Sequence, residues 1–200
     1  HWSGGYNLEK VSDDKYFSEM ATRIVVTSRV NLPQTAFLSY QDEHLSFNGT
    51  VQRYQNLDNV SFVYQRLPQL TMTYNNEWKG FTTQTAGQFV YFDSMKEAGT
   101  RPTGSRFSLY PSVSYPVNTS FGYITPKIGV HTTQYNLNDN RPVGFSTEFN
   151  QLQRTLPIVS LDSGMYFDRE SSLFDTKYTN TLEPRFYDLY VPYKDQSKFP

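Results

Sequence analysis

Three histidines are the first residues whose type could support catalysis or metal binding. His1, His44 and His131 are far apart in the sequence and form neither a His-x-x-His nor a His-Glu-x-x-His spacing. The chain has no cysteine, and it has no Gly-x-Ser-x-Gly elbow, phosphate loop or dinucleotide motif. We therefore predict that the chain is not an enzyme and that it has no catalytic residue, metal site or cofactor.

Two pairs of adjacent carboxylates could in principle support acid–base chemistry. They are Asp13-Asp14 and Asp42-Glu43. A glycosidase needs two carboxylates at a set separation across a sugar, but both pairs lie in polar segments typical of turns. Asn138-Asp139-Asn140 resembles part of a calcium loop, yet the distal glutamate and the correctly spaced glycine are missing. All three segments predict solvated turns.

Charged residues inside strand-like segments are more informative. If such strands crossed a membrane, an Arg or Lys facing lipid near the midplane would cost about 2–4 kcal/mol, so these residues should face a lumen. In a soluble sheet the same residues would face solvent. Glu183 and Arg185 are two positions apart and could pair within a lumen. The lumen-facing candidates are Arg106, Lys127, His131, Asp162, Glu183 and Arg185.

The composition predicts β-strands as the elements that position these residues. Aromatic residues make up 16% of the chain and charged residues only 18%, and the net charge of −1 gives no basic excess for nucleic acid. The mean hydropathy of −0.61 leaves no apolar helix of about 20 residues. A chain that is polar on average yet rich in Tyr, Phe, Thr and Ser fits strands with one apolar and one polar face. Such strands occur in soluble all-β domains and in outer-membrane barrels.

Apolar and polar residues alternate with period two in several segments. Leu45, Phe47, Gly49 and Val51 alternate with polar residues, and the same alternation recurs across 105–117. Several runs exceed the usual five or six residues of soluble strands and reach the roughly 9–11 that cross a bilayer. We predict about nine strands, at 2–10, 23–42, 45–54, 67–75, 80–93, 105–117, 120–135, 152–168 and 178–193.

Short and long polar connections alternate between these strands. The short ones are 42–44, 75–77 and 117–120, and the long ones are 12–21, 55–65, 94–104 and 136–148. Tight turns at one edge and longer loops at the other are typical of an up-and-down membrane barrel. The fold class predicted is therefore all-β, with antiparallel up-and-down strands forming part of a large outer-membrane β-barrel.

Prolines interrupt this pattern because a proline cannot donate a backbone hydrogen bond to a sheet. Pro68 and Pro157 are predicted near the starts of their strands. Pro111, Pro126 and Pro184 fall inside strand-like runs and predict bulges or distorted pairing. In the last run the alternation also slips, because Asp188 follows Phe186 on one face, so that strand has no clean register.

Near its end the chain contains Thr181-Leu182-Glu183-Pro184-Arg185, which runs into Tyr190-Val191-Pro192-Tyr193-Lys194-Asp195-Gln196. This is the most specific of several segments that resemble the LptD family, the lipopolysaccharide-assembly proteins of Gram-negative outer membranes. Val11-Ser12-Asp13-Asp14-Lys15-Tyr16-Phe17 and Arg66-Leu67-Pro68-Gln69 extend the resemblance over most of the 200 residues.

The resemblance implies a fold and a function. Family members carry a periplasmic jelly roll followed by a very large β-barrel, so residues 1–200 would be a partial barrel domain without the jelly roll or the closing strands. The implied function is insertion of lipopolysaccharide into the outer leaflet, with this section forming barrel wall and lumen lining. The implied partners are lipopolysaccharide, the lipoprotein LptE as a plug, and the periplasmic bridge proteins that act through the jelly roll.

Other classes of protein share parts of the pattern. Another outer-membrane barrel, such as a porin or channel, has the same alternation but does not call for the two specific segments. A soluble carbohydrate-binding β-sandwich also explains the aromatic content and the alternation. A secreted glycosidase would need a carboxylate pair that the sequence does not identify.

Overall fold

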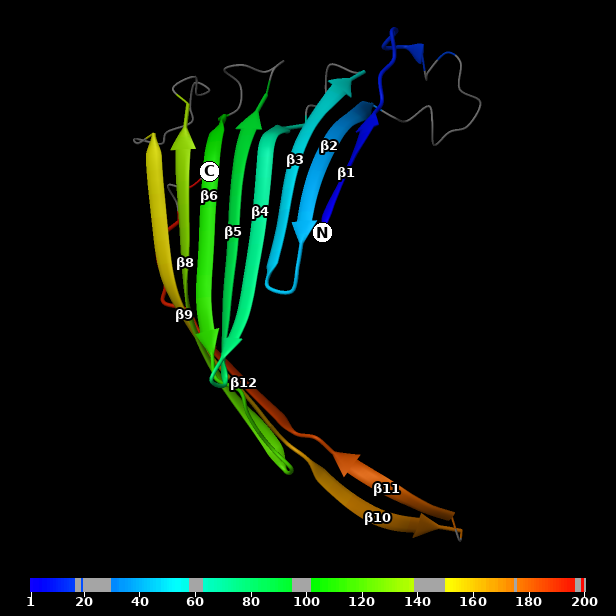
Figure 1. Cartoon of the computed structure of the whole chain (residues 1–200), viewed down its shortest axis with the longest axis vertical. Helices are drawn as coiled ribbons and strands as arrows, with labels where there is room; N and C mark the ends of the chain where they lie inside the picture. Colours follow the sequence, from blue (N-terminus) through cyan, green and yellow to red (C-terminus); the bar gives the residue numbers. More distant parts are fainter. Residues whose placement is uncertain are drawn as a thin grey trace.

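The computed structural model describes residues 1–16, 19, 30–57, 63–94, 102–138, 150–174, 176–196 and 199. Its strands are β1 (Trp2–Leu8), β2 (Asn31–Gln41), β3 (Leu45–Asn56), β4 (Gln65–Trp78), β5 (Phe81–Asp93), β6 (Gly104–Ser114), β7 (Val117–Thr119), β8 (Gly122–Leu137), β9 (Gln151–Met165), β10 (Phe167–Leu173), β11 (Thr176–Leu182) and β12 (Arg185–Tyr190). Figure 1 shows them as one curved layer with a projecting hairpin. The predicted all-β class is confirmed.

The main sheet follows an antiparallel up-and-down path. Its order is β1-β2-β3-β4-β5-β6-β8-β9-β12, with the short β7 paired to β8, while β10 and β11 form a separate two-stranded sheet. Each strand of the main path up to β9 therefore lies beside its predecessor in the chain, apart from the short β7. This is the pairing expected of part of a barrel wall. Among the described residues, no helix is both long and apolar enough to span a membrane.

The connections at the two ends of the strands, here called the two edges of the sheet, differ in length. Residues 42–44, 79–80 and 115–116 separate strands at one edge, and 9–30, 57–64, 94–103 and 138–150 separate strands at the other. We call these the short-turn edge and the long-connection edge. At residues 42–44, Asp42 accepts hydrogen bonds from the amides of His44 and Leu45 at 2.9 and 2.8 Å. These bonds lower the pKa of the Asp42 carboxyl below its ordinary value.

Two of the predicted turns are wrong. Residues 75–77 belong to β4, which continues to Trp78, and the chain turns instead at Lys79 and Gly80. Both turn residues have positive φ, 50° and 85°, as a two-residue type I′ hairpin requires. Residues 117–119 form the short strand β7. The polar residues at 75–77 are of types common in turns. The alternation of β4 nevertheless continues through them to Trp78.

The final part of the chain departs most from the predicted strands. The run predicted at 178–193 is two strands, β11 and β12, separated by Glu183 and Pro184. The run predicted at 152–168 also divides, into β9 and β10, and β10 pairs with β11 as a projecting hairpin. The prediction that the strand near Phe186 has no clean register is wrong, because β12 pairs with β9 in continuous register, with Phe186 and Asp188 on the same face.

Three of the prolines singled out from the sequence fall at irregular places in the ladders, but Pro126 and Pro157 do not. The distortion predicted at Pro126 is absent from the β8–β9 ladder, where Pro126 pairs with Leu161 in continuous register. Pro68 lies within a register shift between Arg66 and Gln69 near the start of β4. The β6–β8 ladder lacks register pairs at Tyr110 and Pro111. Pro184 separates two strands. The prediction for Pro157 is wrong, since it lies in the middle of β9. The partner strand β12 does not extend that far, which leaves one side of β9 open there.

One face of the sheet is apolar and open. In each ladder, directly opposed residues share a face, so the register assigns every strand residue to one of two faces. On β8, Ile124, Ile128 and Val130 lie on this apolar face with exposed fractions of 44%, 56% and 40%. On the opposite face Thr133 is 3% exposed. A soluble sheet buries its apolar face and exposes its polar face. Here the pattern of burial is the reverse.

Aromatic side chains gather on the apolar face at the short-turn edge. The ring centroids of Trp2 and Tyr40 are 4.9 Å apart, and those of Phe81 and Tyr115 are 4.8 Å apart. Trp78, opposite Phe81, is 62% exposed. An exposed row of Trp, Tyr and Phe bordering an apolar band is typical of the girdle at a membrane interface.

Crowding on the other face makes Gly129 intolerant of substitution. A Cβ at Gly129 would lie 2.7 Å from the ring of Tyr110 and 2.9 Å from Cβ of Ser112. We expect Gly129→Ala to destabilise the folded barrel by about 1–3 kcal/mol through overpacking. Thermal unfolding of the full-length protein in detergent measures this. Gly87→Ala is the matched control, because its nearest neighbour would lie at an ordinary 3.5 Å. Equal losses for the two variants would contradict the crowding.

Candidate functional site

The face opposite the apolar face is lined by hydroxyl, amide and charged side chains. We call it the polar face. In its central strands it carries Thr71, Thr73, Gln84, Gln88, Arg106, Ser108, Tyr110, Ser112, Lys127, His131, Thr133, Ser160 and Asp162. Most of these side chains are buried or half-buried, because their neighbours on the same face shield them.

The structure places most of the predicted lumen-facing candidates together on this face. Arg106 on β6, Lys127 and His131 on β8, Asp162 on β9 and Arg185 on β12 all share it by register. Glu183 lies outside the strands, in the link between β11 and β12. The suggested pair between Glu183 and Arg185 is replaced by an ion pair between Arg185 and Asp162.

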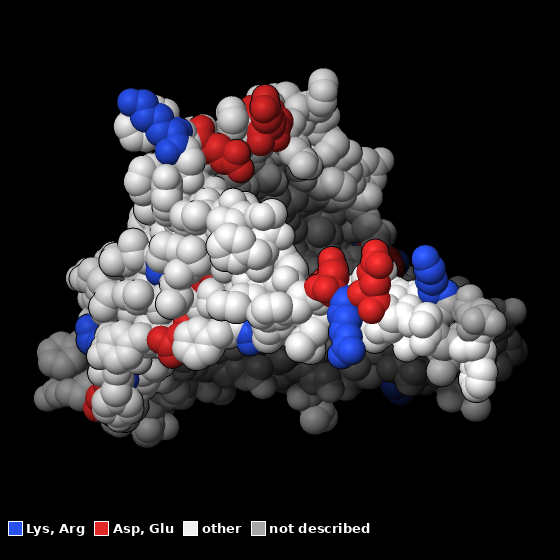
Figure 2. Space-filling model, turned by 90° about the horizontal axis from the view of Figure 1, so that it is seen from below, with Lys and Arg blue, Asp and Glu red and all other residues white. Residues whose placement is uncertain are grey.

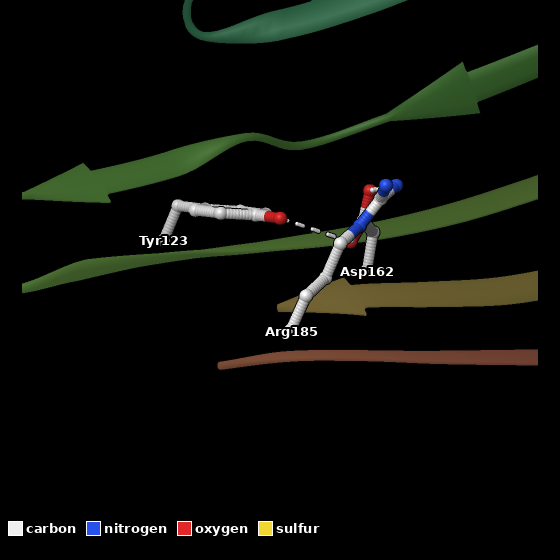
Figure 3. A network of polar contacts seen from close by, with 3 residues as sticks. All are labelled: Tyr123, Asp162 and Arg185. Carbon is white, nitrogen blue, oxygen red and sulfur yellow. Dashed lines mark hydrogen bonds and ion pairs between the residues drawn. The ribbon is translucent and has the colours of Figure 1, made fainter. Parts of the chain in front are cut away.

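A three-residue polar network joins neighbouring strands near the short-turn edge. Arg185 donates from Nε to Oδ1 of Asp162 at 2.8 Å and from Nη2 to Oδ2 at 2.6 Å. The Tyr123 hydroxyl donates to the same Oδ1 at 3.2 Å. Figure 3 shows the side chains of Tyr123 and Arg185 pointing toward Asp162. The side chains of Arg185 and Asp162 are 62% and 26% exposed, so water reaches this bidentate pair.

A hollow of about 590 Å³ lies over the central strands. Its polar-face lining includes Thr71, Gln88, Ser108, Tyr110 and His131. The rings of Tyr110 and His131 meet edge to face with centroids 6.0 Å apart. Hydroxyls, amides and an aromatic ring are the groups that could hydrogen-bond and stack against a polar ligand such as a sugar.

The last described residues return to the polar face near the long-connection edge. Arg154 of β9 donates to the side chain of Gln196, and its guanidinium lies 5.7 Å from the Phe199 ring centroid. Phe199 also meets Tyr135 edge to face at 5.8 Å. Leu152, on the same face, is 8% exposed. The segment most typical of the family resemblance therefore ends against this face.

Charge on the polar face is unevenly distributed. On the described strands of the main sheet, its carboxylates are Glu77 and Asp162, both toward the short-turn edge, whereas Arg66, Arg106 and Arg154 lie toward the other edge. On the side of the molecule seen in Figure 2, charged side chains form separate groups with a broad uncharged surface between them. Within the described ranges, no group of three or more His, Asp or Glu residues could hold a metal ion.

Sequence reasoning did not single out several residues of this face. Tyr123 and Gln88 lie within predicted strands with no role assigned, and Arg66 enters only through the Arg66-Leu67-Pro68-Gln69 segment of the family resemblance. Their polar side chains alternate with apolar residues in the same way as those of the candidates, so alternation alone could have placed Tyr123 and Gln88. Arg66 depends on the irregularity at Leu67 and Pro68, which no pattern of alternation reveals.

Comparison with known proteins identifies the family. The family model described as LptD, LPS transport system D, matches residues 1–200. LPS-assembly protein LptD of Aromatoleum aromaticum is 40% identical over 98% of this chain and 24% of its own length. The LPS-assembly proteins LptD of Azoarcus sp. and Bordetella pertussis are 39% and 35% identical to this chain, each over 98% of it. The chain spans about a quarter of the length of these curated relatives. An antiparallel sheet with an open apolar face, the Leu-Glu-Pro-Arg link and these similarities together show that the chain belongs to the LptD family.

Proposed function

We propose that this chain is a section of outer-membrane β-barrel wall in a protein that inserts lipopolysaccharide into the outer leaflet. The observation that carries the proposal is the inverted sheet, with its exposed apolar face and its shielded polar face. The name of the relatives, LPS-assembly protein, supplies the substrate class. Residues 1–200 are accordingly part of a transmembrane barrel domain that other segments complete.

The two faces have different roles in this proposal. The apolar face contacts lipid acyl chains, and the polar face lines a water-filled lumen. Arg106, Lys127, His131, Asp162 and Arg185 are then lumen residues, and Glu183 lies at the rim. The long-connection edge faces outward and the short-turn edge faces the periplasm, because outer-membrane barrels have short periplasmic turns and longer external loops.

The proposal includes partners. A lipoprotein plug, LptE, would contact the polar face, and the periplasmic bridge proteins would deliver lipopolysaccharide through a jelly-roll domain elsewhere in the full-length protein. The hollow over Thr71, Tyr110 and His131 provides hydroxyl, amide and aromatic groups for a saccharide or for a plug side chain. The proposal includes no chemical reaction, so these residues bind and guide a ligand.

Genetic replacement tests the proposed function. The full-length protein containing this chain is expressed in a Gram-negative strain depleted of its own LptD, and newly synthesised lipopolysaccharide at the cell surface is quantified. We expect restored surface lipopolysaccharide and growth. A folded barrel in the outer membrane that leaves surface lipopolysaccharide at the depleted level would contradict the function while leaving the barrel assignment intact.

A further inference from the structure

Two arginines near the long-connection edge share one hollow on the polar face. Arg66 of β4 and Arg106 of β6 both line a space of about 470 Å³, together with Tyr64, Gln69, Gln88 and Phe92. They lie on either side of β5 and opposite residues two positions apart on it, so their backbones are about 12 Å apart at the usual strand spacing and rise. Both side chains are half-buried, and both can reach the space between them.

The irregularity at Pro68 helps to build this hollow. Arg66 is opposite Phe92, and Gln69 is opposite Val90, so the ladder shifts by one residue between them. Two residues three positions apart therefore share the polar face, which a regular strand would not allow. As a result Arg66 Nη1 donates to Gln69 Oε1 at 3.1 Å. The bulge thus aims both side chains into the hollow.

The floor of the hollow is fixed by packing. Val90, between the two arginines, is 1% exposed although it lies on the polar face. Tyr64 packs edge to face on Phe92 with centroids 5.9 Å apart, and its hydroxyl donates to the carbonyl oxygen of Pro102 at 2.9 Å. The arginine side chains cover an apolar floor while their guanidinium groups stay at its surface.

Both guanidinium groups keep donors available for a ligand. Arg106 Nη2 donates to Gln88 Oε1 at 2.6 Å, and the guanidinium carbon lies 5.5 Å from the Phe92 ring centroid. A guanidinium has five N–H donors, and the amide oxygens of Gln69 and Gln88 orient the groups without neutralising them. The polar-face carboxylates of the described strands, Glu77 and Asp162, lie toward the opposite edge. The positive charge of the pair is therefore uncompensated by any carboxylate of these strands.

We propose that Arg66 and Arg106 form a binding site for the phosphate group of a phosphorylated saccharide. Planar guanidinium groups recognise phosphate through paired, charge-assisted hydrogen bonds. The adjoining amides and the Phe92 ring can contact the sugar. This inference rests on the proposed function, since lipopolysaccharide carries phosphate groups on its sugars, and it assigns the contact to two named residues near the outward edge.

Binding of small probes to the full-length protein in detergent tests the site. The probes are glucose 1-phosphate, inorganic phosphate and glucose, followed by calorimetry or by ³¹P line broadening. We expect glucose 1-phosphate to bind, inorganic phosphate to bind more weakly, and glucose not to bind measurably. Arg66→Gln and Arg106→Gln should each weaken binding of the sugar phosphate about tenfold or more. Binding should also weaken as salt rises.

Lys127→Gln is the matched control. It removes the same charge from the same face, about 26 Å along β8 from Tyr135, the residue opposite Arg106. The control should bind the sugar phosphate as the unmodified protein does. Equal weakening in all three variants would overturn the site in favour of general electrostatics. Binding of inorganic phosphate alone would overturn the saccharide assignment.

A second readout separates this site from the proposed function and from a protein ligand. Each variant is tested for surface lipopolysaccharide and for co-purification with a lipoprotein plug. If the unmodified protein delivers lipopolysaccharide but the arginine variants bind sugar phosphate normally, only the phosphate site is wrong. Loss of the plug with unchanged phosphate binding would assign the arginines to a protein carboxylate instead. Failure of the unmodified protein to deliver lipopolysaccharide would reject the proposed function, whatever the probes show.

Discussion

Replacing Val130 by arginine is expected to prevent stable assembly of the barrel. Val130 lies on the apolar face of β8, opposite Pro157 of β9, and is 40% exposed. In a soluble protein, Arg at such an exposed position would change stability by less than about 0.5 kcal/mol. Facing lipid near the membrane midplane, it costs about 2–4 kcal/mol. The fraction of full-length protein that reaches the outer membrane in folded form measures this effect.

The adjacent residue provides a control at the same depth. His131 follows Val130 directly, lies on the polar face and is half-buried beside Tyr110. His131→Arg introduces the same side chain toward the lumen, so assembly should remain close to that of the unmodified protein. If the two variants assemble equally well, the apolar face does not contact lipid. If His131→Arg is the defective one, the two faces have been assigned the wrong way round.

Reversing the charge of Arg185 is expected to loosen β12. Arg185→Asp removes two short charged hydrogen bonds to Asp162 and places two carboxylates across the β9–β12 pair. We expect a smaller loss of stability than a buried pair would give, because Arg185 is largely exposed. Since β12 pairs with β9 over only six residue pairs, its amides should exchange faster with deuterium.

A reciprocal swap distinguishes the ion pair from a general effect of charge. Asp162→Arg combined with Arg185→Asp restores opposite charges across the same two strands and should recover most of the protection of β12. Arg169→Asp, in the separate β10–β11 hairpin, changes the net charge equally and should leave β12 unchanged. Equal exchange in the reversal and in the swap would show that the pair does not hold β12.

Alternation along the strands carried most of what the sequence could predict. Where neighbours are regular, as from Leu45 to Val51 or from Ile124 to Val130, the predicted face is the observed face. Period two follows directly from strand geometry, so side-chain type alone assigns the face. Alternation predicts Arg106 and Lys127 on the polar side of their strands, and the structure agrees.

Features that depend on pairing between distant segments could not be predicted from local sequence patterns. The turn at Lys79 and Gly80 follows from the pairing of Trp78 with Phe81, although two asparagines nearby imitate a turn. The predicted strands 152–168 and 178–193 are each divided where the β10–β11 hairpin leaves the main sheet. Asp162 meets Arg185 only because that hairpin returns the chain to β9. The register between strands separated by such an inserted hairpin is fixed by pairing in the whole sheet.

Spin-label accessibility along β8 shows whether the apolar face contacts lipid and the polar face contacts water. The chain has no cysteine of its own, so single cysteines can be placed at 124, 125, 127, 128, 130 and 131 and spin-labelled in the full-length protein in lipid bilayers. We predict that labels at 124, 128 and 130 are relaxed by oxygen dissolved in lipid, and that labels at 125, 127 and 131 are relaxed by a water-soluble nickel complex. Two results would contradict a barrel wall with the polar face toward the lumen. One is the reverse assignment, with oxygen relaxing the labels at 125, 127 and 131 and the nickel complex those at 124, 128 and 130. The other is accessibility to the nickel complex at all six positions.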